Sequence, residues 1–224
     1  MKRSRSPGFY NSLPLEAVLM TTSPLKLQVP NNEKKVLLHT CCAPCSCSII
    51  QRMVEAGIEP TVYFYNPNIY PREEYEHRKK EMLRYVQKVK VPFVDADYEV
   101  DGWLEAIKGH EEDAERGKRC TLCFEMRLGK TAAYAAANGF KVFATSLGIS
   151  RWKDLEQVNH AGRRAASLFP GLVYWEHNWR LYGGQEQMEK ISQEENLYRQ
   201  NYCGCVYSLR ESIKRNLARQ SHKA

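Results

Sequence analysis

Short apolar runs alternate with longer amphipathic stretches from Lys35 almost to the end of the chain. Four of the runs have the β-branched and aromatic composition of strands: 35–40, 61–66, 91–97 and 141–147. Helices are predicted in the stretches between and after them: 46–57, 72–90, 101–110, 121–138, 154–169, 185–199 and from about residue 206. Because strands that alternate with helices form parallel sheets, the sequence predicts an α/β fold, with a doubly wound parallel sheet and a helical C-terminal part.

The chain is predicted to form one catalytic domain with an extension at each end. Residues 1–33 contain four prolines among scattered polar residues, which predicts an irregular or disordered N-terminal extension. Residues 34–209 are predicted to form the single α/β domain, since a chain of 224 residues supplies one core of ordinary size. Residues 210–224 are predicted to form a basic C-terminal helix or tail.

The positive charge of the chain is concentrated at its two ends. Residues 1–35 carry six basic and two acidic residues, and residues 210–224 carry five and one, whereas the part between them is close to neutral. Basic ends suit contact with a polyanion such as RNA, although many proteins carry such ends for solubility alone. The chain contains no apolar run of about 18 residues, and its N-terminal apolar stretch is interrupted by Pro14 and Glu16. We therefore expect a cytoplasmic protein without a membrane span or a secretory signal.

Eight cysteines lie in three short clusters. The first cluster, HTCCAPCSCS at 39–48, lies between the first predicted strand and helix, where an α/β fold collects ligands and a helix N-terminus stabilises thiolates. The second is RCTLC at 119–123, and the third is the CGC of residues 203–205. In a reducing cytosol, such clusters bind metal or act in catalysis more often than they form structural disulfides.

The soft thiolate ligands of these clusters suit either zinc or an iron–sulfur cluster. Adjacent cysteines such as Cys41 and Cys42 do not easily close a compact zinc knuckle, and the next pair, Cys120 and Cys123, follows far along the chain. This spacing favours an iron–sulfur cluster over structural zinc or a thiol-only redox site. Cys47 is expected to be a buried bystander.

The CGC cluster has two interpretations. Cys203 and Cys205, with one residue between them, can form a strained and readily reduced disulfide of the kind used in redox chemistry. Alternatively, one or both of them bind metal. Gly204 relaxes the backbone between the two sulfurs in either case.

Polar residues follow the predicted strands at the edge of the sheet where ligands collect. Six of these residues, including one from a later polar loop, are candidate contacts to a substrate or to tRNA: Asn66, Asn68, Ser146, Arg151, Lys153 and Arg180. The loop after residue 145 is rich in glycine and serine and is therefore able to bind phosphate through its backbone amides. Tyr70 is the aromatic side chain that we expect to stack on a base.

Five segments carry a family resemblance: HTCCAPCS, YFYNPNIYPREEY, RCTLCFEMRL, FATSLGISRWKD and ENLYRQNYCGCVYS. In this order, from about Val36 to Leu209, they resemble the QueH family of epoxyqueuosine reductases. The resemblance implies the last step of queuosine synthesis, in which the epoxide oxygen of epoxyqueuosine is removed in the anticodon loop of tRNA without cobalamin. It also implies a fold similar to the PP-loop/HUP class. Because the SGGxDS motif of PP-loop ATPases is absent, we expect no use of ATP.

The same resemblance implies roles for seven of the eight cysteines. Four of them are expected to hold a [4Fe–4S] cluster: Cys41, Cys42, Cys120 and Cys123. Cys203 and Cys205 are expected to form a redox-active disulfide. The family is further associated with a mononuclear iron beside the cluster, and Cys45 is the candidate ligand of this second metal.

Conversion of an epoxide to an alkene consumes two electrons and two protons and releases the oxygen as water. Our hypothesis is that iron acts as a Lewis acid on the epoxide oxygen, while Cys203 and Cys205 relay electrons from an external donor. Tyr70 and His39 are candidate proton donors. Three other functions remain open at this point: an iron–sulfur, PP-loop-like tRNA thiolation enzyme, a zinc-bound RNA-binding module, and a metal-free thiol oxidoreductase.

Overall fold

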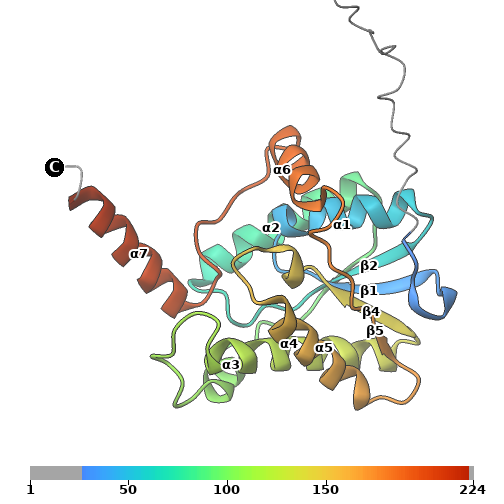
Figure 1. Ribbon diagram of the computed structural model, residues 1–224, viewed down its shortest axis with the longest axis horizontal. Coiled ribbons are helices and arrows are strands. Elements are labelled where there is room, and N and C mark those ends of the chain that lie inside the picture. Colours follow the sequence, from blue (N-terminus) through green and yellow to red (C-terminus); the bar gives the residue numbers. More distant parts are fainter. Residues whose placement is uncertain (1–26, 222–224) are drawn as a thin grey trace, which may run out of the picture.

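The structure, a computed structural model, describes residues 27–221 and is built around one sheet (Figure 1). Its five strands are β1 (Lys35–His39), β2 (Glu59–Phe64), β3 (Phe93–Asp95), β4 (Val142–Thr145) and β5 (Val173–Tyr174). The strands are all parallel and lie in the order β3-β2-β1-β4-β5. The predicted parallel α/β sheet is therefore confirmed.

Helices cover both faces of this sheet (Figure 1). One face carries α1 (Ala43–Glu55), α2 (Arg72–Lys88) and α6 (Gly184–Glu194). The other face carries α4 (Lys118–Ala137) and α5 (Leu155–Ser167), and α3 (Val100–Ala106) packs on α4. Two short 3-10 helices, η2 (Pro30–Asn32) and η3 (Leu147–Ile149), complete the connections. Within the described residues, no helix is both long enough and apolar enough to cross a membrane.

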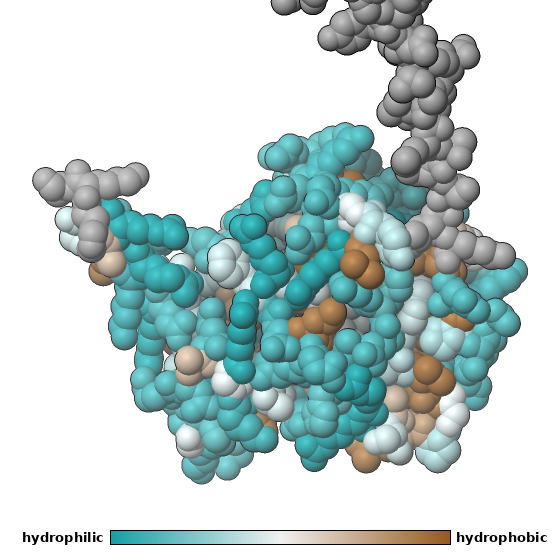
Figure 2. All heavy atoms as spheres, in the orientation of Figure 1, coloured by the Kyte–Doolittle hydropathy of each residue, from teal (hydrophilic) through white to brown (hydrophobic). Residues whose placement is uncertain are grey.

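The last helix, α7 (Val206–Ser221), extends away from the body of the molecule (Figure 1). Only Ser208 and Ser212 of this helix are buried. Figure 2 shows that the surface of α7 and of the adjoining face is largely hydrophilic. The helix is thus held at its first turns, and its remaining turns present mostly polar side chains to solvent.

Strand β1 occupies the centre of the sheet because its residues are apolar on both faces. Val36 and Leu38 pack into the core on the side of α1 and α2, whereas Leu37 points to the opposite face and packs on the side of α4 and α5. All three side chains are fully buried. A central parallel strand has such a continuous apolar sequence because both of its faces are covered. Burial of each of these side chains stabilises the fold by about 1.5–3 kcal/mol.

The direction of strand addition reverses beside β1. The chain passes from β1 to β2 and β3 on one side, and later returns to form β4 and β5 on the other side. His39, at the end of β1, is paired in register with Tyr63 of β2 and with Thr145 of β4. A crevice opens beyond the carboxyl ends of parallel strands at such a reversal. The segments that follow β1 and β4 therefore meet at one edge of the sheet.

Three elements differ from the sequence-based predictions. Helix α1 begins three residues earlier than predicted, because Pro44 is well suited to the first turn of a helix and Cys42 provides the extended N-cap. Helix α4 begins at Lys118, so the second cysteine cluster lies within its first turns. Strand β5 has two residues and therefore gives no periodic signal from which it could be predicted.

The predicted terminal extensions are described only in part. Residues 1–26 of the predicted N-terminal extension, and the last three residues of the predicted C-terminal tail, lie outside the described residues. At the end of the N-terminal extension, Leu27 and Val29 are buried against the hydrophobic core that contains Val36. The described part of the basic C-terminal segment belongs to α7.

Gly184, the first residue of α6, permits a close approach between this helix and the preceding loop. A Cβ atom at this position would lie 1.9 Å from the backbone oxygen of Trp179. We expect Gly184→Ala to lower the free energy of unfolding by about 1–3 kcal/mol, as overpacking does. Gly129→Ala in α4 is the matched control, because a Cβ atom there meets nothing within 4 Å. Urea unfolding measures both variants, and an undiminished stability of Gly184→Ala would contradict the close approach.

Candidate active site

Three thiols come together where β1 passes into α1. Cys42 has an extended backbone (φ −171°, ψ 158°) at the N-cap of α1, and Cys45 lies in the first turn of the helix. The Sγ atoms of Cys41, Cys42 and Cys45 all lie within 4.8 Å of one another, and those of Cys41 and Cys42 are 3.7 Å apart. Among residues 27–221, this is the one group of three or more Cys, His, Asp or Glu side chains with such spacing. Its chemistry is that of a soft metal site.

Hydrogen bonding within this thiol group separates the acidities of its members. Hydrogen bonds from Cys42 and Cys45 lower the pKa of Cys41 well below its usual range, and the positive charges of Lys153 and Arg127 act in the same direction. The hydrogen bond to Cys41 raises the pKa of Cys42 to about 12 and also raises the pKa of Cys45. Cys41 is therefore the most acidic thiol of the group. A metal ion bound here displaces the protons of the other two thiols.

A buried hydrogen-bond network ties the thiol group to the opposite helix layer. Asn66, just after β2, donates from Nδ2 to the carbonyl oxygen of Thr40 over 2.9 Å. Its Oδ1 accepts a hydrogen bond of 2.5 Å from Nη2 of Arg127, a buried residue of α4. Gln200 adds a contact from the C-terminal part, because its Nε2 lies 2.9 Å from Sγ of Cys42. These contacts fix the backbone on which the thiols stand.

His39 is part of the framework beneath the thiol group. Its Nδ1 lies 2.8 Å from Oγ1 of Thr145, and its Nε2 lies 3.2 Å from the carbonyl oxygen of Tyr65. Complete burial, together with the charge of Arg127, lowers the pKa of His39 to about 3, so the imidazole is neutral. His39 does not line the cavity described below. Its contacts therefore fit a role in joining strand ends rather than the predicted proton transfer.

The second cysteine cluster lies in the first turns of α4. Cys120 lines the same cavity as Cys41 and Cys45, whereas Cys123 is buried in a small apolar cluster with Trp103. Burial raises the pKa of Cys120 to about 12, and neighbouring cysteines add to this effect. In the described part of the chain, neither cysteine joins the 4.8 Å group of three thiols.

The CGC segment directly precedes α7 and contains two free thiols. Cys203 is exposed and Cys205 is buried, and both line the cavity. Gly204 has a φ angle of +145°, a backbone conformation that residues other than glycine rarely adopt. The backbone amide of Tyr70 donates to the carbonyl oxygen of Gly204 over 2.8 Å, and Nη1 of Arg78 donates to that of Cys203 over 3.0 Å. These contacts hold the segment at the edge of the sheet.

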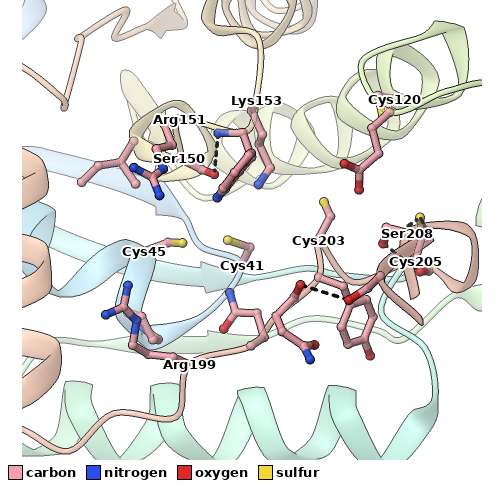
Figure 3. A pocket seen from close by; sticks show the side chains of 18 of the residues that line it. Cys41, Cys45, Cys120, Ser150, Arg151, Lys153, Arg199, Cys203, Cys205 and Ser208 are labelled. Atoms are coloured by element: carbon pink, nitrogen blue, oxygen red, sulfur yellow. Dashed lines mark hydrogen bonds between the residues drawn. The ribbon is translucent and has the colours of Figure 1, made fainter. Parts of the chain in front are cut away.

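Members of all three cysteine clusters line one cavity of about 610 Å³. In Figure 3, Cys41, Cys45 and Cys203 point into this space, with Arg151 and Lys153 on one side of it. The lining contains seven Lys or Arg side chains but only two carboxylates, those of Glu115 and Glu189. A cavity with this charge attracts anionic groups such as phosphates, while its thiols supply metal-binding or redox chemistry.

The predicted substrate contacts fall into two sets. Arg151 and Lys153 line the cavity. Asn66, Asn68 and Ser146 are buried and do not line it. Within that buried set, Oδ1 of Asn68 and Oγ of Ser146 have no hydrogen-bond partner. The lining residues are thus placed for direct contact, whereas the buried ones support the loops behind it.

Two other predicted residues have surroundings that differ from those expected. The guanidinium of Arg180 donates to three backbone carbonyls of the loop from Gly148 to Lys153, where an anion contact was predicted. Tyr70 is about half exposed and does not line the cavity. Its backbone amide and carbonyl instead contact Gly204 and Tyr202. Both residues act here on the shape of the site.

Sequence reasoning did not identify several residues of the site. Arg116, Trp152 and Arg199 line the cavity, and Arg127 lies buried beneath it. The alternation of basic and aromatic residues in the RWK segment is a signal that could have pointed to Trp152. Arg127 carries no such signal, because a buried arginine in a helix has the same local sequence as an exposed one.

Comparisons with known proteins agree with this arrangement. The family model described as epoxyqueuosine reductase QueH matches residues 36–211. The epoxyqueuosine reductase QueH of Acinetobacter baylyi is 51% identical over 193 residues, which cover 86% of this chain and 88% of that protein. The proteins of the same name from Haemophilus influenzae and Thermotoga maritima are 52% and 34% identical, over 84% and 79% of this chain and 77% and 91% of their own lengths. The chain therefore belongs to the QueH family of epoxyqueuosine reductases.

Proposed function

We propose that the chain is an epoxyqueuosine reductase, which removes the epoxide oxygen of epoxyqueuosine in the anticodon loop of tRNA and gives queuosine. The observation that carries this proposal is the cavity of about 610 Å³, in which three cysteine clusters open among basic side chains in a member of the QueH family. Thiols suit the redox chemistry. The basic lining suits the phosphates that flank a nucleoside in RNA.

The donor chemistry of the site fits an iron–sulfur centre. In this proposal, four cysteines hold a [4Fe–4S] cluster: Cys41, Cys42, Cys120 and Cys123. Cys45 binds a second, mononuclear iron. The proposal is supported by the short distances between Cys41, Cys42 and Cys45, and by the position of Cys120 on the same cavity. Bound iron would offer a Lewis-acidic site and a path for the electrons that the dithiol supplies, and the proposed reaction uses neither ATP nor cobalamin.

Cys203 and Cys205 are the dithiol of the proposed reaction. Oxidation of these two thiols to a disulfide releases two electrons and two protons, which is what the conversion of an epoxide to an alkene and water consumes. An external electron donor then reduces the disulfide. The exposure of Cys203 supports this role, because the donor must reach one of the two sulfur atoms.

Lys153 is a cationic side chain that lines the cavity together with the thiols. Its burial lowers the pKa of Lys153, but electrostatic attraction to nearby cysteine sulfurs, those of Cys203 and Cys41 foremost, outweighs this effect and raises the pKa. The side chain therefore remains an ammonium group among the thiols. In this proposal it donates a hydrogen bond to an oxygen of the substrate, either of the epoxide or of a phosphate.

Anaerobically purified protein is expected to convert epoxyqueuosine in tRNA to queuosine, with a reductant and without ATP. Mass spectrometry of the digested nucleosides detects the loss of one oxygen, while iron and sulfide assays with an absorption spectrum report the cluster. ATP-dependent insertion of sulfur would instead identify a thiolation enzyme. Zinc without turnover would identify an RNA-binding module, and full activity after chelation would identify a metal-free thiol oxidoreductase.

A further inference from the structure

Trp152 is exposed to a degree that separates it from every other tryptophan of the chain. It lines the cavity mouth and is 68% exposed, whereas Trp103, Trp175 and Trp179 are between 1% and 5% exposed. A single exposed apolar side chain needs no explanation by itself. The hydrogen bonds that hold the loop around Trp152, however, indicate a reason for the exposure of this side chain.

The loop from Gly148 to Lys153 is held by side chains along its whole length. Each of its six backbone carbonyls accepts a hydrogen bond from a side chain of another segment. Arg180 donates to three of them over 2.7–2.8 Å, and Gln185 donates to one over 3.0 Å. Arg116 donates to the remaining two, of which one is the carbonyl of Trp152 itself, over 2.9 and 3.2 Å. The backbone that carries the indole is therefore fixed, so binding requires little ordering of the loop.

The surroundings of the indole determine what it can bind. The guanidinium of Arg151 lies 5.0 Å from the centre of the Trp152 ring, a cation–π distance. The basic side chains that line the cavity include Arg116 beside this loop, Lys153 within it and Arg215 of α7. An aromatic platform among cations is the arrangement that binds single-stranded nucleic acid, in which bases stack and phosphates pair with the cations. The charge disfavours a basic partner and an uncharged apolar one.

We propose that Trp152 stacks on a nucleobase of the single-stranded loop of the RNA substrate, next to the nucleoside that enters the cavity. This inference rests on the proposed function, because that function supplies the RNA. A nucleoside that reaches the thiols must leave the stack of its neighbours, and Trp152 then replaces the lost stacking of one neighbour. Trp152 is accordingly a substrate-binding residue, and it takes no part in the redox step.

Tryptophan fluorescence tests this directly, because only Trp152 is exposed among the four tryptophans. A synthetic anticodon stem-loop is expected to quench the emission of the holoenzyme, and a blunt RNA duplex is expected to quench it much less. The quenching should be absent in Trp152→Phe. Trp152→Ala should weaken binding of the stem-loop by about 5- to 100-fold, whereas Trp152→Phe keeps most of the affinity. The KM for tRNA should rise in Trp152→Ala by a similar factor, with little change in kcat.

Leu168→Ala is the matched control, since Leu168 is also 68% exposed but lies at the C-cap of α5 and does not line the cavity. Its affinity and activity should equal those of the unsubstituted protein. Unchanged binding of the stem-loop by Trp152→Ala overturns the inference. So does a variant that binds RNA normally and reacts with dithionite but fails with a protein donor, because Trp152 would then dock that donor. Either result leaves the reductase activity of the unsubstituted protein intact, whereas failure of the proposed function would remove that activity itself.

Discussion

Cys41→Ser is expected to abolish reduction of epoxyqueuosine, with a fall of more than about a hundredfold in kcat/KM. Loss of an outer contact to a metal site already costs 10- to 100-fold, and Cys41 is the most acidic thiol of the three-thiol group. Serine has nearly the same shape but is a poor ligand for iron. The same variant should therefore lose most of its iron and the absorbance of the cluster. Steady-state kinetics and elemental analysis of anaerobically purified protein measure both effects.

Two further serine variants decide which cysteines hold the cluster. Cys120→Ser should lose the cluster as Cys41→Ser does, whereas Cys45→Ser should keep the cluster absorbance and lose only the second iron. The reverse pattern would assign the cluster to the compact group of Cys41, Cys42 and Cys45. Cys47→Ser is the control, because Cys47 is fully buried in α1 and its Sγ donates to the carbonyl of Pro44, a bond that a hydroxyl also forms. Its metal content should not change.

Cys203→Ser is expected to stop repeated turnover while leaving the metal centre intact. With one thiol of the pair removed, no disulfide forms, so electrons from the donor no longer reach the site through Cys205. Iron content and the cluster spectrum should match those of the unsubstituted protein. Reaction of the enzyme with excess tRNA and a dithiol reductant measures turnover, and the expected decrease is at least about tenfold, since exchange requires a thiolate.

The matched control for this experiment is Ser212→Ala in α7, the helix that follows the CGC segment. Ser212 is buried and lines the cavity, and its hydroxyl makes one long contact of 3.4 Å with the carbonyl of Asn201. Its replacement should leave the number of turnovers unchanged. If Cys203→Ser lost iron together with turnover, Cys203 would be a metal ligand, which is the other interpretation of the CGC cluster.

The strands that position the site could be predicted because their cause is local. Val36, Leu37 and Leu38 form an uninterrupted apolar run, and only a central strand covered on both faces buries such a run completely. From parallel strands it follows that residues after β1 and β4 meet at one edge. Strand β5 could not be predicted in this way, because its two residues depend on pairing with β4 rather than on their own pattern.

The contacts of long polar side chains could not be predicted for the opposite reason, since their cause lies in distant parts of the chain. The sequence around Arg180 suggests an anion site, but its guanidinium binds carbonyls about 30 residues earlier in the sequence. Arg127 reaches Asn66, 61 residues away, and this contact exists only after α4 has packed on the sheet. The cysteine clusters were visible as motifs, whereas their relative positions required the fold.

The thiols of the cavity come from segments that span most of the chain, from Cys41 to Cys205. Each of these segments alone binds metal weakly, because the entropy of closing the long loops between them opposes assembly. The proposed metal ligands, from Cys41 to Cys123, come together only after α4 has packed beside the start of α1. In the proposed iron-bound enzyme, metal affinity is therefore thermodynamically linked to the global folding equilibrium, and loading with iron would shift this equilibrium toward the native state. The proposal thus implies that the supply of iron and the lifetime of the folded chain are coupled quantities in a cell.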